Sequence, residues 1–345
     1  MAICNSDAKC RRADIFTSPS APALLDPTRF PVYSALSRFL PRISKKKKEE
    51  ERMSLRRIVW ALAVVLCLMA PAAIRAQGEY LDIFVVKVKA EKLPDFQAET
   101  KKWADANRRF NGDHWITFET VYGEGNVYQF TSTRKDYAEI DKAGEAEMLA
   151  ANQALGEKGA EKAGQDFVSY LAWSRTEFRR RRWDLSHKPP ADAEAYAKLI
   201  GESRYLRTTA VYVRPGRIVE LEALLKDAKA AAESNPLTQP VFVSQVVEGG
   251  KGTIFYVSTL RSSLAGFDHN PSMLEILGEE GYKKYLQVAA DTVETTESTL
   301  YRINPELSNP PDDVVKVAPD FWHPKEVMAP MAKPKAPAKA PAKKP

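Results

Sequence analysis

The chain has 345 residues, 44% of them hydrophobic, so it has room for two ordinary domains with buried cores. Its formal net charge of +6 is unevenly distributed, because residues 1–76 hold 14 basic and 6 acidic side chains. The remainder holds 37 basic and 39 acidic side chains and has a net charge near −2. An acidic remainder lacks the positive footprint of a nucleic-acid-binding protein, and that class is excluded.

Residues 53–76 have the pattern of a secretory signal peptide. Arg56 and Arg57 precede an apolar run at 58–70, and the small residue Ala76 precedes the expected cut. The run is too short to span a bilayer comfortably, and an uncleaved anchor is the alternative. We therefore expect an exported protein, periplasmic or secreted. All three cysteines lie before the cut, so the mature chain would contain no disulfide or thiolate metal site.

A signal peptide should begin the chain, yet residues 1–52 precede this one. The stretch 45–52 consists only of Lys, Glu and Arg, which purine-only codons can encode, so it could be a translated ribosome-binding site. We interpret 1–52 as a misassigned extension, with Met53 as the initiator. The alternative is a disordered basic leader.

The first folded unit is predicted to cover residues 79–186. Residues 80–88 are β-branched and aromatic and predict a strand, and apolar residues at helical spacing predict a helix over 93–110. Strands at 115–122 and 127–133 form a hairpin across Gly123 and Gly125. A helical region at 136–173, broken near Gly156 and Gly159, leads to a short edge strand at 176–183.

The second unit, residues 204–308, repeats this order. Strands are predicted at 208–214, 239–247, 253–259 and 298–303, and helices at 218–233, 272–277 and 281–293. A linker at 187–203 with a short helical segment joins the units. Residues 309–345 form an extended tail, in which 331–345 is a Lys/Ala/Pro sequence that cannot bury a core.

An internal repeat supports this division. Residues 155–186 align without a gap on residues 277–308, and nine of these 32 positions are identical, including Leu-Gly-Glu-Xaa-Gly and Leu-Ser. Each unit has the order β-α-β-β-α-β, which leaves one sheet face bare. We predict an α+β protein in which two fused ferredoxin-like units pack sheet to sheet about a pseudo-twofold axis.

The element order and the repeat over about residues 79–308 resemble the dimeric α+β barrel superfamily. This group includes antibiotic-biosynthesis-type monooxygenases, the NIPSNAP family and haem-binding chlorite dismutase-like proteins. The resemblance implies a pocket for small or aromatic ligands between one sheet and its helices.

Aromatic and imidazole side chains at strand and helix positions are the candidates for lining such a pocket. They are Trp103, His114, Trp115, Tyr128 and Trp173 in the first unit and Tyr256 in the second. The alternative is that these aromatic residues only fill the core. The first unit is richer in Trp and Tyr and is the preferred location.

No cofactor is expected. Haem would need a histidine on the helical face of the second unit, where His269 is the only candidate, and a surface or capping role suits that residue better. No pair of histidines has metal-ligand spacing, so no metal site is predicted.

Four consecutive arginines, 179–182, stand out in the predicted edge strand. Alternate side chains of a strand point to opposite faces, so two should face each way. We interpret them as charges that guard an exposed edge; an anion or partner site is the alternative.

Three functions agree with these features. The first is an exported binding or interaction module of unassigned ligand, for which a small apolar or aromatic molecule is the candidate partner. The second is a cofactor-independent monooxygenase-like enzyme acting on a small aromatic or apolar substrate. The third is an envelope-associated structural protein, with weak membrane-surface contact through the Lys/Pro tail. A pocket with inward-directed polar groups around His114 or Tyr128 would favour the enzyme.

Overall fold

The computed structural model describes residues 79–235, 239–268 and 271–323, all of which belong to one compact unit of the chain, Ala70–Pro345. The predicted extension (1–52), the predicted signal peptide (53–76), His269 and the Lys/Ala/Pro sequence lie outside the described residues. Within the described residues, no helix has the length and apolar character needed to cross a membrane.

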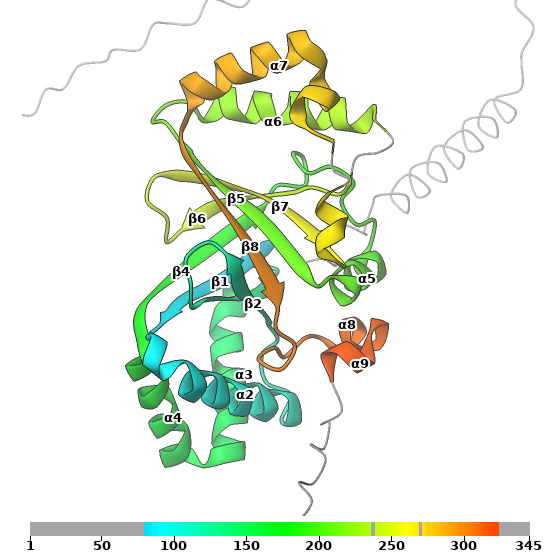
Figure 1. The fold of residues 1–345 in the computed structure, drawn as a ribbon. Coiled ribbons are helices and arrows are strands. Elements are labelled where there is room, and N and C mark those ends of the chain that lie inside the picture. Colours follow the sequence, from blue (N-terminus) through cyan, green and yellow to red (C-terminus); the bar gives the residue numbers. More distant parts are fainter. Residues whose placement is uncertain (1–78, 236–238, 269–270, 324–345) are drawn as a thin grey trace, which may run out of the picture. The chain divides into compact units, whose positions relative to one another are not determined.

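Eight antiparallel strands form a closed barrel (Figure 1). Their order around the barrel is β1-β3-β2-β8-β5-β7-β6-β4. The strands are β1 (Tyr80–Val88), β2 (Ile116–Tyr122), β3 (Val127–Arg134), β4 (Leu171–Arg181), β5 (Tyr205–Val213), β6 (Phe242–Glu248), β7 (Thr253–Arg261) and β8 (Val293–Ile303).

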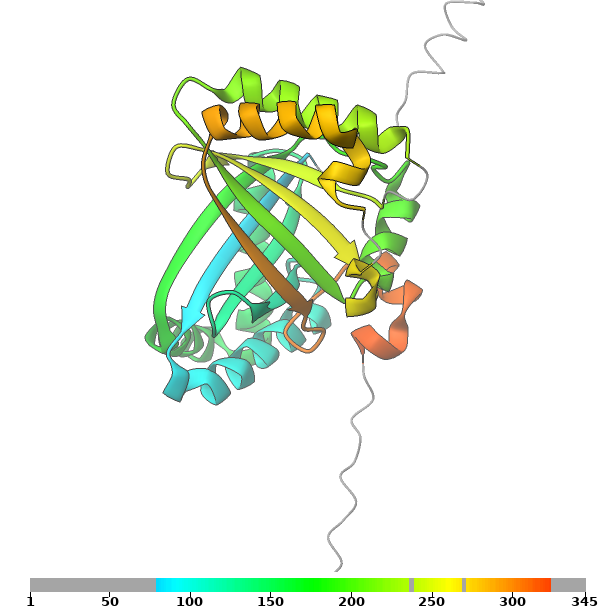
Figure 2. The same cartoon turned by 45° about the horizontal axis from the view of Figure 1, so that its top comes forward.

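Helices cover the outside of the barrel, α2–α4 over one half and the pair α6 and α7 over the other (Figures 1 and 2). The helices are α2 (Leu93–Arg109), α3 (Ala138–Leu155), α4 (Glu157–Tyr170), α5 (Ala193–Glu202), α6 (Ile218–Glu233), α7 (Met273–Thr292), α8 (Asp312–Val317) and α9 (Pro319–Trp322). Two short 3₁₀ turns are η2 (Ala90–Lys92) and η3 (Leu264–Phe267). The predicted α+β class is confirmed.

The two halves are joined along two seams. Within the halves the strands lie in the orders β4-β1-β3-β2 and β8-β5-β7-β6, and the pairs β2–β8 and β4–β6 close the barrel. The prediction of an edge strand at 176–183 is therefore wrong, because β4 begins at Leu171 and is hydrogen-bonded on both sides. Closure leaves no edge for the arginines to guard.

The arginines do alternate between the faces of β4. Arg179 and Arg181 are buried, whereas Arg180 pairs with Glu79 and Arg182 with Glu222 outside. The buried Arg179 guanidinium lies 2.7 Å from the carboxylate of Glu177 on the same strand, so its charge is neutralised where water cannot solvate it.

The repeated Leu-Gly-Glu-Xaa-Gly sequence marks a break in each helical region. Gly156 (φ 73°, ψ 157°) separates α3 from α4, and Gly278 (φ 70°, ψ 174°) kinks α7 in the same way. Positive φ is costly for residues with a Cβ, which explains glycine at both positions. The predicted second break at Gly159 is absent, since that residue lies within α4.

The repeated Leu-Ser pair attaches each half to the other. Leu185, after β4, packs with Val213 and Phe255 of the second half, and Leu307, after β8, packs with Val86 and Tyr128 of the first.

Each neighbouring serine hydroxyl bridges two backbone groups. Ser186 donates to the carbonyl of Arg182 (2.8 Å) and accepts from the N–H of Val243 (2.9 Å). Ser308 donates to the carbonyl of Asn304 (2.6 Å) and accepts from the N–H of Thr117 (2.8 Å). These reciprocal bonds hold the two seams at their ends.

The predicted linker is packed against the C-terminal helices. A Cβ on Gly201 of α5 would lie 2.5 Å from Cβ of Val317, so only glycine allows α5 and α8 to approach this closely. Trp322 is 1% exposed and its indole N–H points to the carbonyl of Gly201 at 3.3 Å. The chain beyond Asn309 therefore contributes to the described fold as far as Trp322.

Candidate functional site

A cavity of about 250 Å³ lies in the first half, between the outer face of the sheet and helices α2, α3 and α4. Aromatic side chains supply most of its apolar wall. They are Phe84, Trp103, Trp115, Phe130 and Phe167. Such a wall can enclose a flat apolar ligand.

Cross-strand pairing brings the sheet residues of this wall together. Phe84 of β1 lies opposite Phe130 of β3, and Asp82 lies opposite Ser132. Residues two apart on a strand share a face, so both pairs and Arg134 point outward to the helices. The sheet thus supplies an apolar floor beside a polar end.

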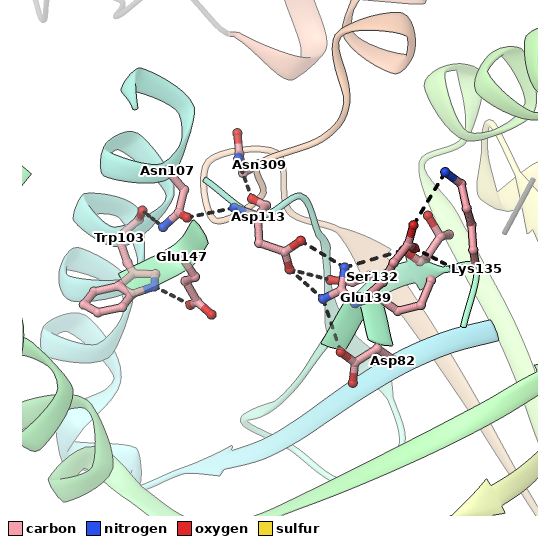
Figure 3. Close-up of polar contacts among 11 residues, drawn as sticks. Asp82, Trp103, Asn107, Asp113, Ser132, Lys135, Glu139, Glu147 and Asn309 are labelled. Carbon is pink, nitrogen blue, oxygen red and sulfur yellow. Dashed lines mark hydrogen bonds and ion pairs between the residues drawn. The ribbon is translucent and has the colours of Figure 1, made fainter. Parts of the chain in front are cut away.

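Arg134 organises the polar end of the cavity. Figure 3 shows Asp113 and Asp82, the two carboxylates that it contacts. The two terminal nitrogens of Arg134 lie 2.9 and 2.6 Å from the carboxylate oxygens of Asp113, and one of them lies 3.2 Å from Asp82. Burial alone would lower the pKa of Arg134, but the hydrogen bonds and charge of Asp113 outweigh it, and the net shift is upward. The guanidinium stays charged and fixes both carboxylates.

The loop that carries Asp113 is held from two directions (Figure 3). Asn107, fully buried on α2, accepts from the N–H of Asp113 at 3.1 Å and donates to the carbonyl of Trp103 at 3.0 Å. Asn309, from the segment after β8, donates to the carbonyl of Asp113 at 2.7 Å. Both halves of the chain therefore position this carboxylate.

Glu147 of α3 is the titratable group that distinguishes the cavity. Its half-buried carboxylate accepts a hydrogen bond from the indole N–H of Trp103 (Figure 3). Burial raises the pKa of Glu147, and the negative charges of Asp113 and Asp82 raise it further, against the lowering effect of the Trp103 bond. A carboxylate with a raised pKa is a stronger proton acceptor than an ordinary one.

Two buried polar atoms on the wall lack partners among the described residues. They are the hydroxyl of Thr100, which is 3% exposed, and Nε of Arg134. Buried polar groups are rarely left unsatisfied, so both favour a ligand or water in this cavity.

A second hollow of about 380 Å³ adjoins the cavity. The two share Asp113, Trp115, Ser132 and Arg134, and the hollow extends between α3, α5 and α8. The Arg134–Asp113 pair thus forms part of the partition between them.

Of the six predicted pocket residues, the structure places two, Trp103 and Trp115, on the cavity wall. His114 lies in the adjoining hollow. Tyr128 shares a sheet face with Phe130, but it fills the core beneath α2, where it packs on Phe96 and accepts from Gln97 at 2.9 Å. Its predicted place in a pocket is wrong, because α2 covers that end of the strand completely.

The other two candidates lie on different surfaces from the cavity. Trp173 packs with Ile83 and Val85 on the opposite face of the sheet. Tyr256 is 4% exposed and donates to Glu177 at 3.2 Å, with the Arg179 guanidinium 3.4 Å from its ring centre. Burial raises its pKa. Strand alternation directs these side chains away from the helices, so they cannot line this cavity.

The charged groups of the site were missed by the sequence interpretation. Asp82, Asp113, Arg134 and Glu147 come from two strands, a loop and a helix, at no regular spacing. The one available signal is Gly112-Asp113 directly after a helix. A Cβ on Gly112 would lie 1.9 Å from the Asn107 side chain, so this turn requires glycine.

Metal and haem chemistry find no support in these residues. The described part of the chain contains no group of three or more His, Cys, Asp or Glu side chains that could hold a metal ion. No histidine of the described residues lines the cavity, and a haem proximal ligand is usually histidine. We derive no step through either group.

No known protein family and no curated protein matches the sequence. Solved structures with a similar fold include an anthrone oxidase-like protein (15% identity, TM-score 0.44, covering 66% of this chain and 93% of that one). A second is a provisionally assigned monooxygenase from Fusobacterium nucleatum subsp. nucleatum (10% identity, TM-score 0.43, covering 65% of this chain and 91% of that one). A third is a haem-binding protein from Thermus thermophilus (11% identity, TM-score 0.38, covering 67% of this chain and 93% of that one).

Proposed function

We propose that the first-half cavity binds a small aromatic molecule carrying a hydroxyl or carbonyl group, and that Glu147 accepts a proton from it. The observation that carries this proposal is the carboxyl group of Glu147, which has a raised pKa and is held by the indole of Trp103 in an aromatic wall. An acceptor so placed suits general base catalysis.

The reaction that fits these groups is cofactor-independent oxygenation. Glu147 would remove one proton from a ring methylene next to a carbonyl, and the resulting carbanion is the electron donor to O₂. One oxygen atom becomes a new carbonyl, and the other leaves as water with the two methylene hydrogens. The substrate loses four electrons and O₂ gains four, so no further reductant is needed.

Binding without chemistry is the second candidate. Arg134 forms ion pairs with Asp113 and Asp82, so three of the charged groups serve to hold the wall. A carrier or sensor of aromatic compounds would need no more than this. Unlike the enzyme, it would keep its function when Glu147 is replaced.

Oxygen uptake with a panel of hydroxylated polycyclic aromatic ketones tests the proposal. We expect uptake and a product that has gained one oxygen atom and lost two hydrogens. Glu147→Gln should reduce the rate by about 100-fold or more while binding persists. Glu145→Gln, an exposed change on the same helix, is the matched control. Binding without turnover would favour the second candidate, and absence of both would refute the proposal.

We further propose that the two halves arose by duplication. Exchanging β1–β4 with β5–β8 leaves the cyclic strand order unchanged. The equivalent breaks at Gly156 and Gly278 and the reciprocal bonds of Ser186 and Ser308 support the same origin. Export by the 53–76 segment is likewise a proposal; the mass of the purified mature chain, which would begin at Gln77, tests it.

A further inference from the structure

Thr100 of α2 carries a buried hydroxyl group that the rest of the described fold does not use. The residue is 3% exposed and lines the first-half cavity, yet its Oγ1 atom has no hydrogen-bond partner among the described residues. A threonine inside a helix can bond to the carbonyl four residues back, as Thr292 of α7 does to Val288 at 2.7 Å. Thr100 makes no such bond, so its hydroxyl points to a partner from outside the chain.

The position of Thr100 places this hydroxyl close to the proposed proton acceptor. Trp103 follows three residues later on α2, so the two side chains face the same side of the helix. The indole of Trp103 donates to the carboxylate of Glu147 (Figure 3). Thr100, Trp103 and Glu147 all line the cavity, so one small molecule can reach both the hydroxyl and the carboxylate.

A second group of the lining indicates what that molecule must carry. Nε of Arg134 is also buried and also lacks a partner among the described residues. A guanidinium N–H can only donate a hydrogen bond, and a threonine hydroxyl can donate one as well. Both groups can therefore be satisfied by an oxygen atom with free lone pairs, whereas a hydrocarbon would leave both unsatisfied.

The charges of the lining favour a neutral ligand over an anion. Asp82 and Asp113 both pair with Arg134, so two carboxylates share one guanidinium. Glu147 adds a further carboxylate, and Glu99 pairs with a lysine outside the lining. A ligand carboxylate would meet this excess of negative charge, but a ketone would not.

We infer that Thr100 binds the carbonyl oxygen of a neutral aromatic ketone and holds the adjacent ring methylene towards Glu147. The inference rests on the proposed function of this cavity and specifies its substrate. When Glu147 takes a proton from the methylene, the electron pair left on carbon delocalises onto the carbonyl oxygen, which becomes an enolate oxygen. The Thr100 hydroxyl keeps its own proton and donates a hydrogen bond that strengthens as this charge develops.

Calorimetric titration with two probes of the same carbon skeleton tests the inference. The probe α-tetralone has the carbonyl group and the methylene beside it, and tetralin has no oxygen. Thr100→Val keeps the shape of the side chain and removes the hydroxyl. We expect this variant to bind α-tetralone about tenfold more weakly than the unchanged chain does, with the affinity for tetralin altered less than about twofold. Thr100→Ser retains the hydroxyl and should retain most of the affinity for α-tetralone.

The stability of the same variants separates a binding role from a structural one. Thr100→Val should leave the midpoint of urea unfolding unchanged or raise it, because a methyl group replaces an unsatisfied buried hydroxyl. Thr292→Val is the matched control, since its hydroxyl is equally buried but is bonded to Val288 and lies in the second half. That variant should lower the midpoint and leave the binding of α-tetralone unchanged.

Each contrary result has a distinct meaning. Equal affinity of the unchanged chain and Thr100→Val for α-tetralone would overturn the inference and leave the proposed function in place. So would an equal loss of affinity for both probes, which would report an altered cavity, or a lower unfolding midpoint of Thr100→Val, which would report a partner within the fold. Tighter binding of the anion α-naphthoate than of α-tetralone would overturn the assignment of a neutral ketone. If neither α-tetralone nor tetralin binds to the unchanged chain, the proposed function fails and the inference fails with it.

Discussion

Replacing Ser308 by alanine removes the hydroxyl that joins the end of β8 to β2. The hydroxyl accepts from the N–H of Thr117 at 2.8 Å and donates to the carbonyl of Asn304 at 2.6 Å. Ser308 and Thr117 are both fully buried, so water cannot replace the lost partner. The other seam offers the equivalent change, Ser186→Ala, which leaves the N–H of Val243 unpaired.

The cost follows from the buried N–H group. An unsatisfied buried donor costs about 1–3 kcal/mol, and the alanine leaves only a small void. We expect each single variant to lower the free energy of unfolding by about 2 kcal/mol. The two serines lie in different seams with no shared partner, so the double variant should lose about 4 kcal/mol.

Urea unfolding followed by tryptophan fluorescence measures these differences. Ser169→Ala is the control, because its exposed hydroxyl bonds only the carbonyl of Asp166 and its loss should cost less than about 0.5 kcal/mol. A loss below about 0.5 kcal/mol for either buried serine would refute the reasoning. So would a large loss in one seam only, since the two seams have the same hydrogen bonds.

Three further outcomes are expected. Gly201→Ala should lower the free energy of unfolding in urea by about 1–3 kcal/mol, because its Cβ would meet Val317 at 2.5 Å. Gly144→Ala, with open space around it, should leave the free energy of unfolding unchanged or raise it. Equal effects of the two substitutions would contradict this. The raised pKa of Glu147 means that the folded chain holds this proton more tightly than the unfolded chain, so stability falls as pH rises from the ordinary carboxyl range through the raised value. Glu147→Gln should flatten the dependence of unfolding free energy on pH in this range, and an unchanged slope would count against the raised pKa of Glu147. Glu177→Gln leaves the buried Arg179 charge without its carboxylate and should lower the free energy of unfolding, measured by thermal unfolding, by about 3–5 kcal/mol. A smaller loss than in the control Glu280→Gln, which breaks an exposed ion pair, would exclude the pairing of Glu177 with Arg179.

Much of the fold could be predicted from local sequence patterns. Strand and helix periodicity located every strand and the main helices, because the side chains that face the core recur at fixed intervals. The closure of the barrel could not be predicted from such patterns. Whether β4 is an edge depends on its pairing with β6, which is distant in the chain, and arginines on β4 suit an edge and a charged interior equally well.

The candidate site was predicted less well than the fold. Trp103 and Trp115 lie in the cavity because the helical face and the start of β2 were assigned correctly. Tyr128 and Tyr256 both lie on strands, but Tyr128 points outward beneath a helix and Tyr256 points into the barrel, because strand alternation directs them to opposite faces of the sheet. The Arg134 network joins elements brought together only by the finished sheet, so spacing in the chain carries no sign of it.

The central claim is that the first-half cavity binds a small aromatic molecule. Gly164 of α4 lines this cavity, and a Cβ added there meets no atom within 4 Å, so the helix has room for a side chain at this position and Gly164→Phe is chosen to fill the space. Calorimetric titration of a hydroxylated polycyclic ketone into the unchanged chain, Gly164→Ala and Gly164→Phe is the most direct test. We predict similar affinity for the first two and no binding to Gly164→Phe. Equal binding to all three would place the ligand elsewhere and contradict the account.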